Sequence, residues 1–147
     1  MNKKDISIAV MKLFLYGDLC KMIHYSTKKH HCHVLCDTVR DDITEFADEL
    51  AEQAYGILGK PSYSDFSLRN SVKKTSDIAQ LCRNAVGVVE PLRAKIENSP
   101  KFSGIVSLID DFKSKMSKNA YLATFDGVSN TLLNECVDTV VRKYIRK

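Results

Sequence analysis

The sequence predicts an all-α fold, an up-and-down bundle of four to five helices that includes an additional C-terminal helix. Apolar residues recur at steps of three and four through five segments, which is the period of an α-helix. No segment alternates apolar and polar residues between turn signals, as a β-hairpin would. Both observations favour helices packed on one another over any sheet.

The first two segments predict the longest helices. In the first, from about residue 5 to residue 29, one face carries Ile6, Val10, Leu13, Gly17, Cys20 and His24. The second begins near Cys32 and runs to Leu58, where Gly59 and Pro61 provide a glycine stop and a following proline. Its apolar arc is separated from an acidic arc that holds His33, Asp37, Asp41, Glu45, Asp48 and Glu52. This helix therefore has one face for the core and another for solvent or ligands.

The later segments predict shorter helices. Residues 60–74 are polar and rich in serine, which indicates a connector. We expect a third helix capped by Thr75 or Ser76 and kinked at Pro91. A fourth helix covers residues 105–123, and a final one follows Gly127 and ends in a basic turn.

Length and composition limit the class of protein. A chain of 147 residues with 44% hydrophobic content predicts a single domain, residues 1–147. The sequence contains neither the roughly 18 consecutive apolar residues of a membrane span nor the apolar run of a signal peptide, so we expect a cytoplasmic protein. The five cysteines lie within helical patterns and are expected to be reduced thiols. The net charge of +4 does not by itself indicate nucleic-acid binding.

Side chains that bind metals concentrate in one region, residues 24–52. All four histidines of the chain lie in its first ten positions, and acidic residues follow them. Imidazole together with carboxylate suits iron, manganese or zinc, and helical bundles build metal centres from such groups on facing helices. The alternative is that the acidic arc is only a solvated helix face.

The segment Asp48-Glu-Leu-Ala-Glu-Gln-Ala-Tyr-Gly-Ile-Leu-Gly-Lys-Pro61 resembles the Asp-Glu-x-Ala-Glu-Arg-x-x-x-Leu-Gly-Gly-x-Pro stretch of the Dps branch of ferritin-like proteins. In that family the aspartate and the second glutamate are ferroxidase ligands, which points here to Asp48 and Glu52. A further ligand histidine lies fifteen residues before the aspartate, where this chain has His33. The other ligand histidine ends the first long helix in a context similar to residues 22–25, which points to His24.

The resemblance implies a ferritin-like fold and a ferrous-iron site between two subunits of a homo-oligomer that is at least a dimer. His24 and His33 of one chain would face Asp48 and Glu52 of another, with Asp37 as an auxiliary ligand. Residues 104–125 resemble the last bundle helix of the family, so the helix after Gly127 would be an addition.

Two other functions compete with this interpretation. The segment between the two histidines is shorter than in the family, and Gln53 replaces the usual arginine. These departures favour a non-enzymatic helical interaction module that has lost the metal site. Basic residues at both ends also allow association with DNA without redox chemistry, through Lys3, Lys4, Arg142, Lys143, Arg146 and Lys147.

Overall fold

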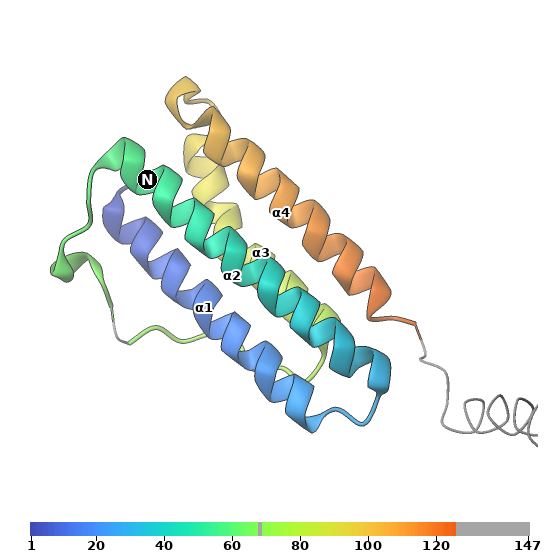
Figure 1. The fold of residues 1–147 in the computed structure, drawn as a ribbon. Helices are drawn as coiled ribbons and strands as arrows, with labels where there is room; N and C mark the ends of the chain where they lie inside the picture. Colours follow the sequence, from blue (N-terminus) through green and yellow to red (C-terminus); the bar gives the residue numbers. More distant parts are fainter. Residues whose placement is uncertain (68, 126–147) are drawn as a thin grey trace, which may run out of the picture.

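The computed structural model describes residues 1–67 and 69–125, so the predicted helix after Gly127 lies outside the described residues. Within them the chain is helical and contains no strand, as the sequence predicts. The elements are α1 (Lys3–Ser26), α2 (His30–Leu58), the short 3-10 turn η1 (Tyr63–Asp65), α3 (Ile78–Ile96), the turn η2 (Pro100–Phe102) and α4 (Ser103–Leu122) (Figure 1). None of these helices is both long and apolar enough to cross a membrane.

The four helices form two antiparallel hairpins that pack side by side (Figure 1). In the first hairpin, His24 contacts His33 at one end, and Ser7 contacts Tyr55 at the other. In the second, Arg93 of α3 binds Asp110 of α4. Around the bundle, α1 lies between α2 and α3, while α4 lies between the same two helices on the other side.

One long connector, residues 59–77, joins the two hairpins. It leaves α2 beside Lys3, passes Tyr16 at the middle of α1, and reaches the C-terminal end of α1 before α3 begins. Consequently α2 and α3 run in the same direction, and the chain does not follow the simple up-and-down order that we predicted (Figure 1). The connector is long enough for this crossover because α1, with 24 residues, extends only about 36 Å.

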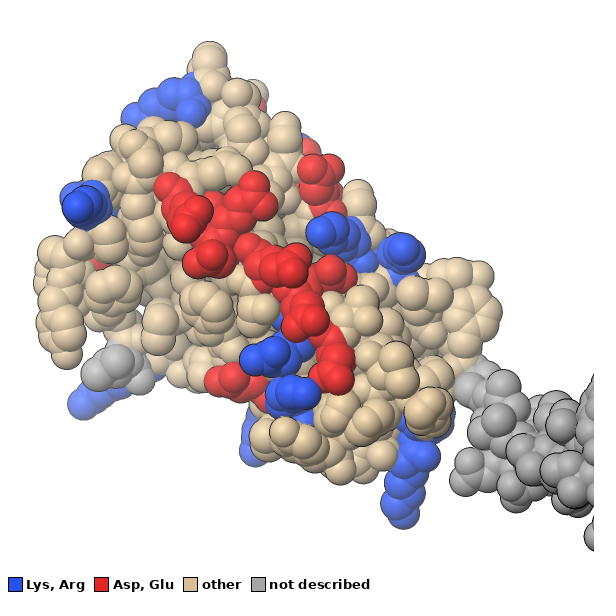
Figure 2. Space-filling model, in the orientation of Figure 1, with Lys and Arg blue, Asp and Glu red and all other residues tan. Residues whose placement is uncertain are grey.

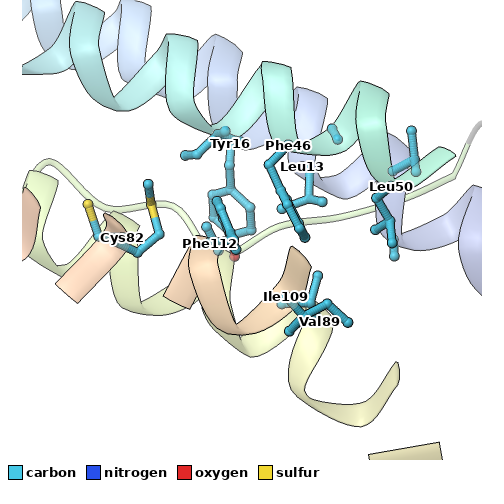
Figure 3. Packing of buried hydrophobic residues seen from close by; sticks show 14 of the residues in the cluster. Leu13, Tyr16, Phe46, Leu50, Cys82, Val89, Ile109 and Phe112 are labelled. Carbon is cyan, nitrogen blue, oxygen red and sulfur yellow. The ribbon is translucent and has the colours of Figure 1, made fainter. Parts of the chain in front are cut away.

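A single apolar core fills the space between the helices. The rings of Phe46 on α2 and Phe112 on α4 stack at its centre with a centroid separation of 3.9 Å (Figure 3). All four helices contribute to the core, including Leu13 and Tyr16 of α1, Leu50 of α2, Cys82 and Val89 of α3, and Ile109 of α4. The predicted apolar stripes therefore face inward.

The helix ends differ in detail from the sequence prediction. Helix α1 begins two residues earlier than expected, because Asn2 and Asp5 form a reciprocal capping box. It ends at Ser26, which lets α2 begin at His30. The cap of α3 is Asp77 and not Thr75 or Ser76, since the Asp77 carboxylate accepts a hydrogen bond from the Ala79 N–H at 2.9 Å. Gly59 ends α2 as predicted, with a φ of +88°.

Candidate metal-binding site

Two of the predicted ligands, His24 and His33, meet where α1 and α2 join. Their rings stack with centroids 3.7 Å apart and planes inclined by 29°. The Nδ1 of His24 lies 2.9 Å from the backbone oxygen of His33, and the Nδ1 of His33 lies 3.0 Å from the backbone oxygen of His24. The three-residue link between the helices, residues 27–29, brings the two side chains together.

This reciprocal arrangement fixes which nitrogen of each ring carries a proton. A backbone carbonyl only accepts hydrogen bonds, so each Nδ1 must donate one. In the neutral imidazole the proton is then on Nδ1, and the lone pair is on Nε2. Metal-binding histidines commonly have their second nitrogen held by a carbonyl or carboxylate in this way. Both rings therefore have the tautomer that offers Nε2 to a metal ion.

Asp37 lies beside the pair, one turn of α2 beyond His33. Its carboxylate oxygen is 3.4 Å from the Nδ1 of His24 and 2.7 Å from the Nζ of Lys21. The hydrogen bond from Lys21 lowers the pKa of Asp37, and the same contact raises the pKa of Lys21. Because Asp37 approaches the Nδ1 side of His24, it is placed to orient this ring.

The other two predicted ligands, Asp48 and Glu52, lie farther along α2. Eleven residues separate Asp37 from Asp48, which corresponds to about 16 Å along the helix. Both side chains are exposed. Figure 2 shows a band of acidic side chains that crosses one face of the molecule. The exposed acids of α2 are Asp41, Glu45, Asp48, Glu49 and Glu52. One chain therefore does not bring these carboxylates to the histidine pair.

The remaining candidates near the turn do not complete a site within one chain. The His30 ring lies 6.4 Å from that of His33, and the Nε2 of His31 lies 3.6 Å from the Sγ of Cys32. Across residues 1–67 and 69–125, no group of three or more histidine, cysteine, aspartate or glutamate side chains is arranged to hold a metal ion.

Sequence reasoning missed two polar contacts of α2, and one of them involves a candidate residue. Lys21 precedes His24 by three residues, a helical spacing that signals a shared face, and it binds Asp37. Asn119 of α4 is 4% exposed and donates a hydrogen bond of 2.7 Å to Asp42, which is a polar link between α4 and α2. The helical period of residues 105–123 does not reveal this second contact, because it joins two segments distant in sequence.

Comparisons of the chain with protein-family models, curated proteins and solved structures gave no match.

Proposed function

We propose that this chain is a ferritin-like, self-associating protein that binds ferrous iron between two copies of itself. His24 and His33 of one copy supply the nitrogen ligands, and Asp48 and Glu52 of the other supply the carboxylates. The observation that carries the proposal is the stacked histidine pair, in which both Nδ1 atoms are held by carbonyls and both Nε2 lone pairs remain for a metal.

The helix order supports the ferritin-like part of the proposal. Bundles of that class have one long crossover connection, and here residues 59–77 cross along α1 between two antiparallel hairpins. The resemblance of residues 48–61 to the Dps motif points to the same class and comes from the sequence alone.

The exposed carboxylates explain why the site would need a second copy. Two imidazoles leave a metal ion with unfilled ligand positions, and carboxylates add both ligands and negative charge. Within the described residues, Asp48 and Glu52 form no ion pair, and both are open to an approaching chain. A two-fold interface along α2 would bring each histidine pair to the carboxylates of the partner, which makes two equal sites.

Iron is the cargo in this proposal, and the residues around it have separate roles. The histidines would hold Fe²⁺, while the carboxylates would offset the additional charge when oxygen or peroxide oxidises it to Fe³⁺. Asp37, held by Lys21, would keep the His24 ring in its orientation, so its contribution is to positioning. Manganese and zinc accept the same ligands and belong in the same binding experiment.

A mixing experiment tests whether two copies share the site. His33→Ala and the double variant Asp48→Asn/Glu52→Gln should each lose Fe²⁺ binding, measured by anaerobic calorimetry. When the two are unfolded, mixed equally and refolded, half of the dimers are mixed, and each has one intact site. About one quarter of wild-type binding should then return. Asp41→Asn/Glu45→Gln, on the same exposed arc, is the matched control and should bind normally.

Each result has a definite meaning. Binding that survives in both variants would show that these residues are not the ligands. Loss in both variants without recovery in the mixture would contradict the sharing of one site between two copies. Light scattering on the wild type must show a dimer or larger assembly, since a monomer contradicts the shared site.

The second candidate is a helical interaction module without metal chemistry. It is favoured by the lack of a three-ligand group within the described part of one chain. It also fits the exposed apolar side chains of Met22, Tyr25 and Val34 around the α1–α2 turn. A wild-type protein that binds none of Fe²⁺, Mn²⁺ and Zn²⁺ would select this function.

A further inference from the structure

A groove between α1, α3 and the connector has a strongly basic end. The hollow has a volume of about 480 Å³, and Lys12, Tyr16, Lys73, Arg83 and Asn84 are among the residues that line it. A second hollow of about 230 Å³ continues from it along α1 and α3, and the two share Lys12, Gly87 and Val88 in their walls. Together the two hollows have a volume that is common for small-molecule sites.

The charge at the basic end is not neutralised by the protein. Three cationic residues line it, one each from α1, the connector and α3, and no aspartate or glutamate of the described chain lines this hollow. Lys12 and Lys73 form no ion pair with any described residue, in contrast to Lys21, Arg93 and Lys113 elsewhere. Like charges gathered without counter-charge repel one another, and a bound anion relieves that repulsion.

Hydrogen bonds position the backbone of Lys73 and the guanidinium group of Arg83. The N–H of Lys73 donates a hydrogen bond of 3.2 Å to the buried hydroxyl of Tyr16, which fixes the connector against α1. This leaves the Tyr16 proton for donation to a group in the groove. Arg83 donates to the Oε1 of Gln80 from Nε at 3.3 Å and from one terminal nitrogen at 3.0 Å. These contacts orient Arg83 without cancelling its charge, so the other terminal nitrogen can bind an anion.

The continuation of the groove is largely apolar. Ile8, Ala9 and Leu92 contribute to its wall, and its one carboxylate, Asp5, is paired with Lys95 at 3.3 Å. Gly87 lies where the two hollows meet, and a Cβ added there would have no atom within 4 Å. A side chain at position 87 would therefore extend into open space beside the groove. Pro91 has no N–H, so the Gly87 carbonyl lacks its usual helical donor and remains an acceptor next to the groove.

We propose that this groove binds a phosphate monoester that carries an apolar group. Its phosphate lies among Lys12, Lys73, Arg83 and the Tyr16 hydroxyl, and its apolar part extends past Gly87 along Ile8 and Leu92. This site is separate from the histidine pair, since Lys12 and His24 are twelve residues apart on α1, about 18 Å along the helix. It does not depend on metal binding.

Hexyl phosphate, inorganic phosphate and hexanol are the probes for calorimetry with the full chain. Hexyl phosphate should bind roughly tenfold or more tightly than inorganic phosphate, because only the ester also buries an alkyl chain. Hexanol should bind more weakly than the ester because it lacks the charge. The double variant Lys73→Gln/Arg83→Gln should lose roughly tenfold or more in affinity for both phosphates.

Gly87→Leu tests the groove itself. The leucine side chain should fill the space where the hollows meet and abolish hexyl phosphate binding, while it improves the helix propensity of α3. Circular dichroism should show that Gly87→Leu keeps its helicity, so a loss of binding could not be attributed to unfolding. Gly56→Leu is the matched control, since Gly56 is also an exposed helical glycine with no atom within 4 Å of an added Cβ. This control should bind like wild type.

The source of the phosphate is distinguished with vesicles. Binding to vesicles of phosphatidic acid and phosphatidylcholine that Gly87→Leu abolishes would identify a lipid headgroup as the ligand. Binding of hexyl phosphate without such vesicle binding would identify a soluble ester. Failure of wild type to bind hexyl phosphate, or equal binding by Gly87→Leu, would overturn the proposal.

Discussion

The rings of His24 and His33 stack 3.7 Å apart, and the Nδ1 of each donates a hydrogen bond to the backbone carbonyl of the other residue. The pair therefore also connects the last turn of α1 to the first turn of α2. The three-residue link, the ion pair of Lys21 with Asp37 and the core below also hold these helix ends together.

Replacing either histidine by alanine should loosen the α1–α2 turn. His33→Ala removes one hydrogen bond and the stacked ring, which costs about 1 kcal/mol of unfolding free energy. Amide hydrogen exchange in residues 26–34 should become faster, while exchange in α3 and α4 stays unchanged. His30→Ala removes an exposed ring 6.4 Å away and serves as the control. Unchanged exchange in His33→Ala would show that the pair does not stabilise the turn.

A close approach of α1 and α2 depends on Gly17. A Cβ added at this buried position would lie 2.9 Å from the Cγ2 of Thr44. The Thr44 methyl cannot move away easily, because its hydroxyl donates a hydrogen bond of 2.9 Å to the Arg40 carbonyl. Gly17→Ala should therefore lower the unfolding free energy by about 1 kcal/mol, as overpacking exceeds the gain in helix propensity. Urea denaturation measures this change.

A double-mutant cycle separates the steric clash from other effects of Gly17→Ala. Thr44→Ser deletes only the methyl group, so the alanine should be tolerated in the double variant, with a coupling free energy of about 1–2 kcal/mol. Gly56→Ala has open space around its new Cβ and should raise stability by about 0.5–1 kcal/mol. Independent effects of the two substitutions at residues 17 and 44 would contradict the contact.

Burial predicts the order in which the thiols react. It raises the pKa of Cys82 to about 12 and that of Cys36 to about 11, and it also raises the pKa of Cys20. The thiolate is the reactive form, so these three should resist iodoacetamide near pH 8. Cys32 is only partly buried and should react first among the four described cysteines. Peptide mass mapping before and after denaturation measures the order, and rapid labelling of native Cys82 would contradict it.

Local sequence patterns predicted the helices because each helix carries its own signal. The apolar period places Ile6, Val39 and Ile109 in the core, and Gly59 ends α2 at a position that requires positive φ. The crossover was not predicted, because the path of residues 59–77 depends on contacts such as Tyr16 with Lys73. These partners are far apart in sequence and leave no periodic pattern.

The candidate sites show the same difference between local sequence patterns and contacts between distant segments. The Dps-like motif pointed to His33, and the separate similarity of residues 22–25 pointed to His24. The structure places their rings in contact, but their role as iron ligands stays a prediction. The basic groove had no signal in the sequence, because Lys12, Lys73 and Arg83 come from three separate segments. Single lysines and arginines in such segments are ordinary surface residues until the fold brings them together.

The pairing of α3 with α4 should depend on pH through Asp110. Its two carboxylate oxygens accept hydrogen bonds from the Nε of Arg93 at 2.7 Å and from a terminal nitrogen at 2.9 Å. This contact lowers the pKa of Asp110 below its usual 3.8. A carboxyl group whose pKa is lower in the folded state stabilises the fold at pH values above its unfolded-state pKa. This stabilisation is lost as the pH falls through the folded-state pKa. Asp110→Asn should therefore lower the Tm slightly near pH 7 and leave it unchanged at roughly pH 2.

Asp111→Asn is the matched control, because this exposed neighbour forms no ion pair within the described residues and should not alter the Tm at either pH. If Asp110→Asn lowered the Tm equally at both pH values, the asparagine side chain itself, and not the loss of the ion pair, would explain the decrease in Tm.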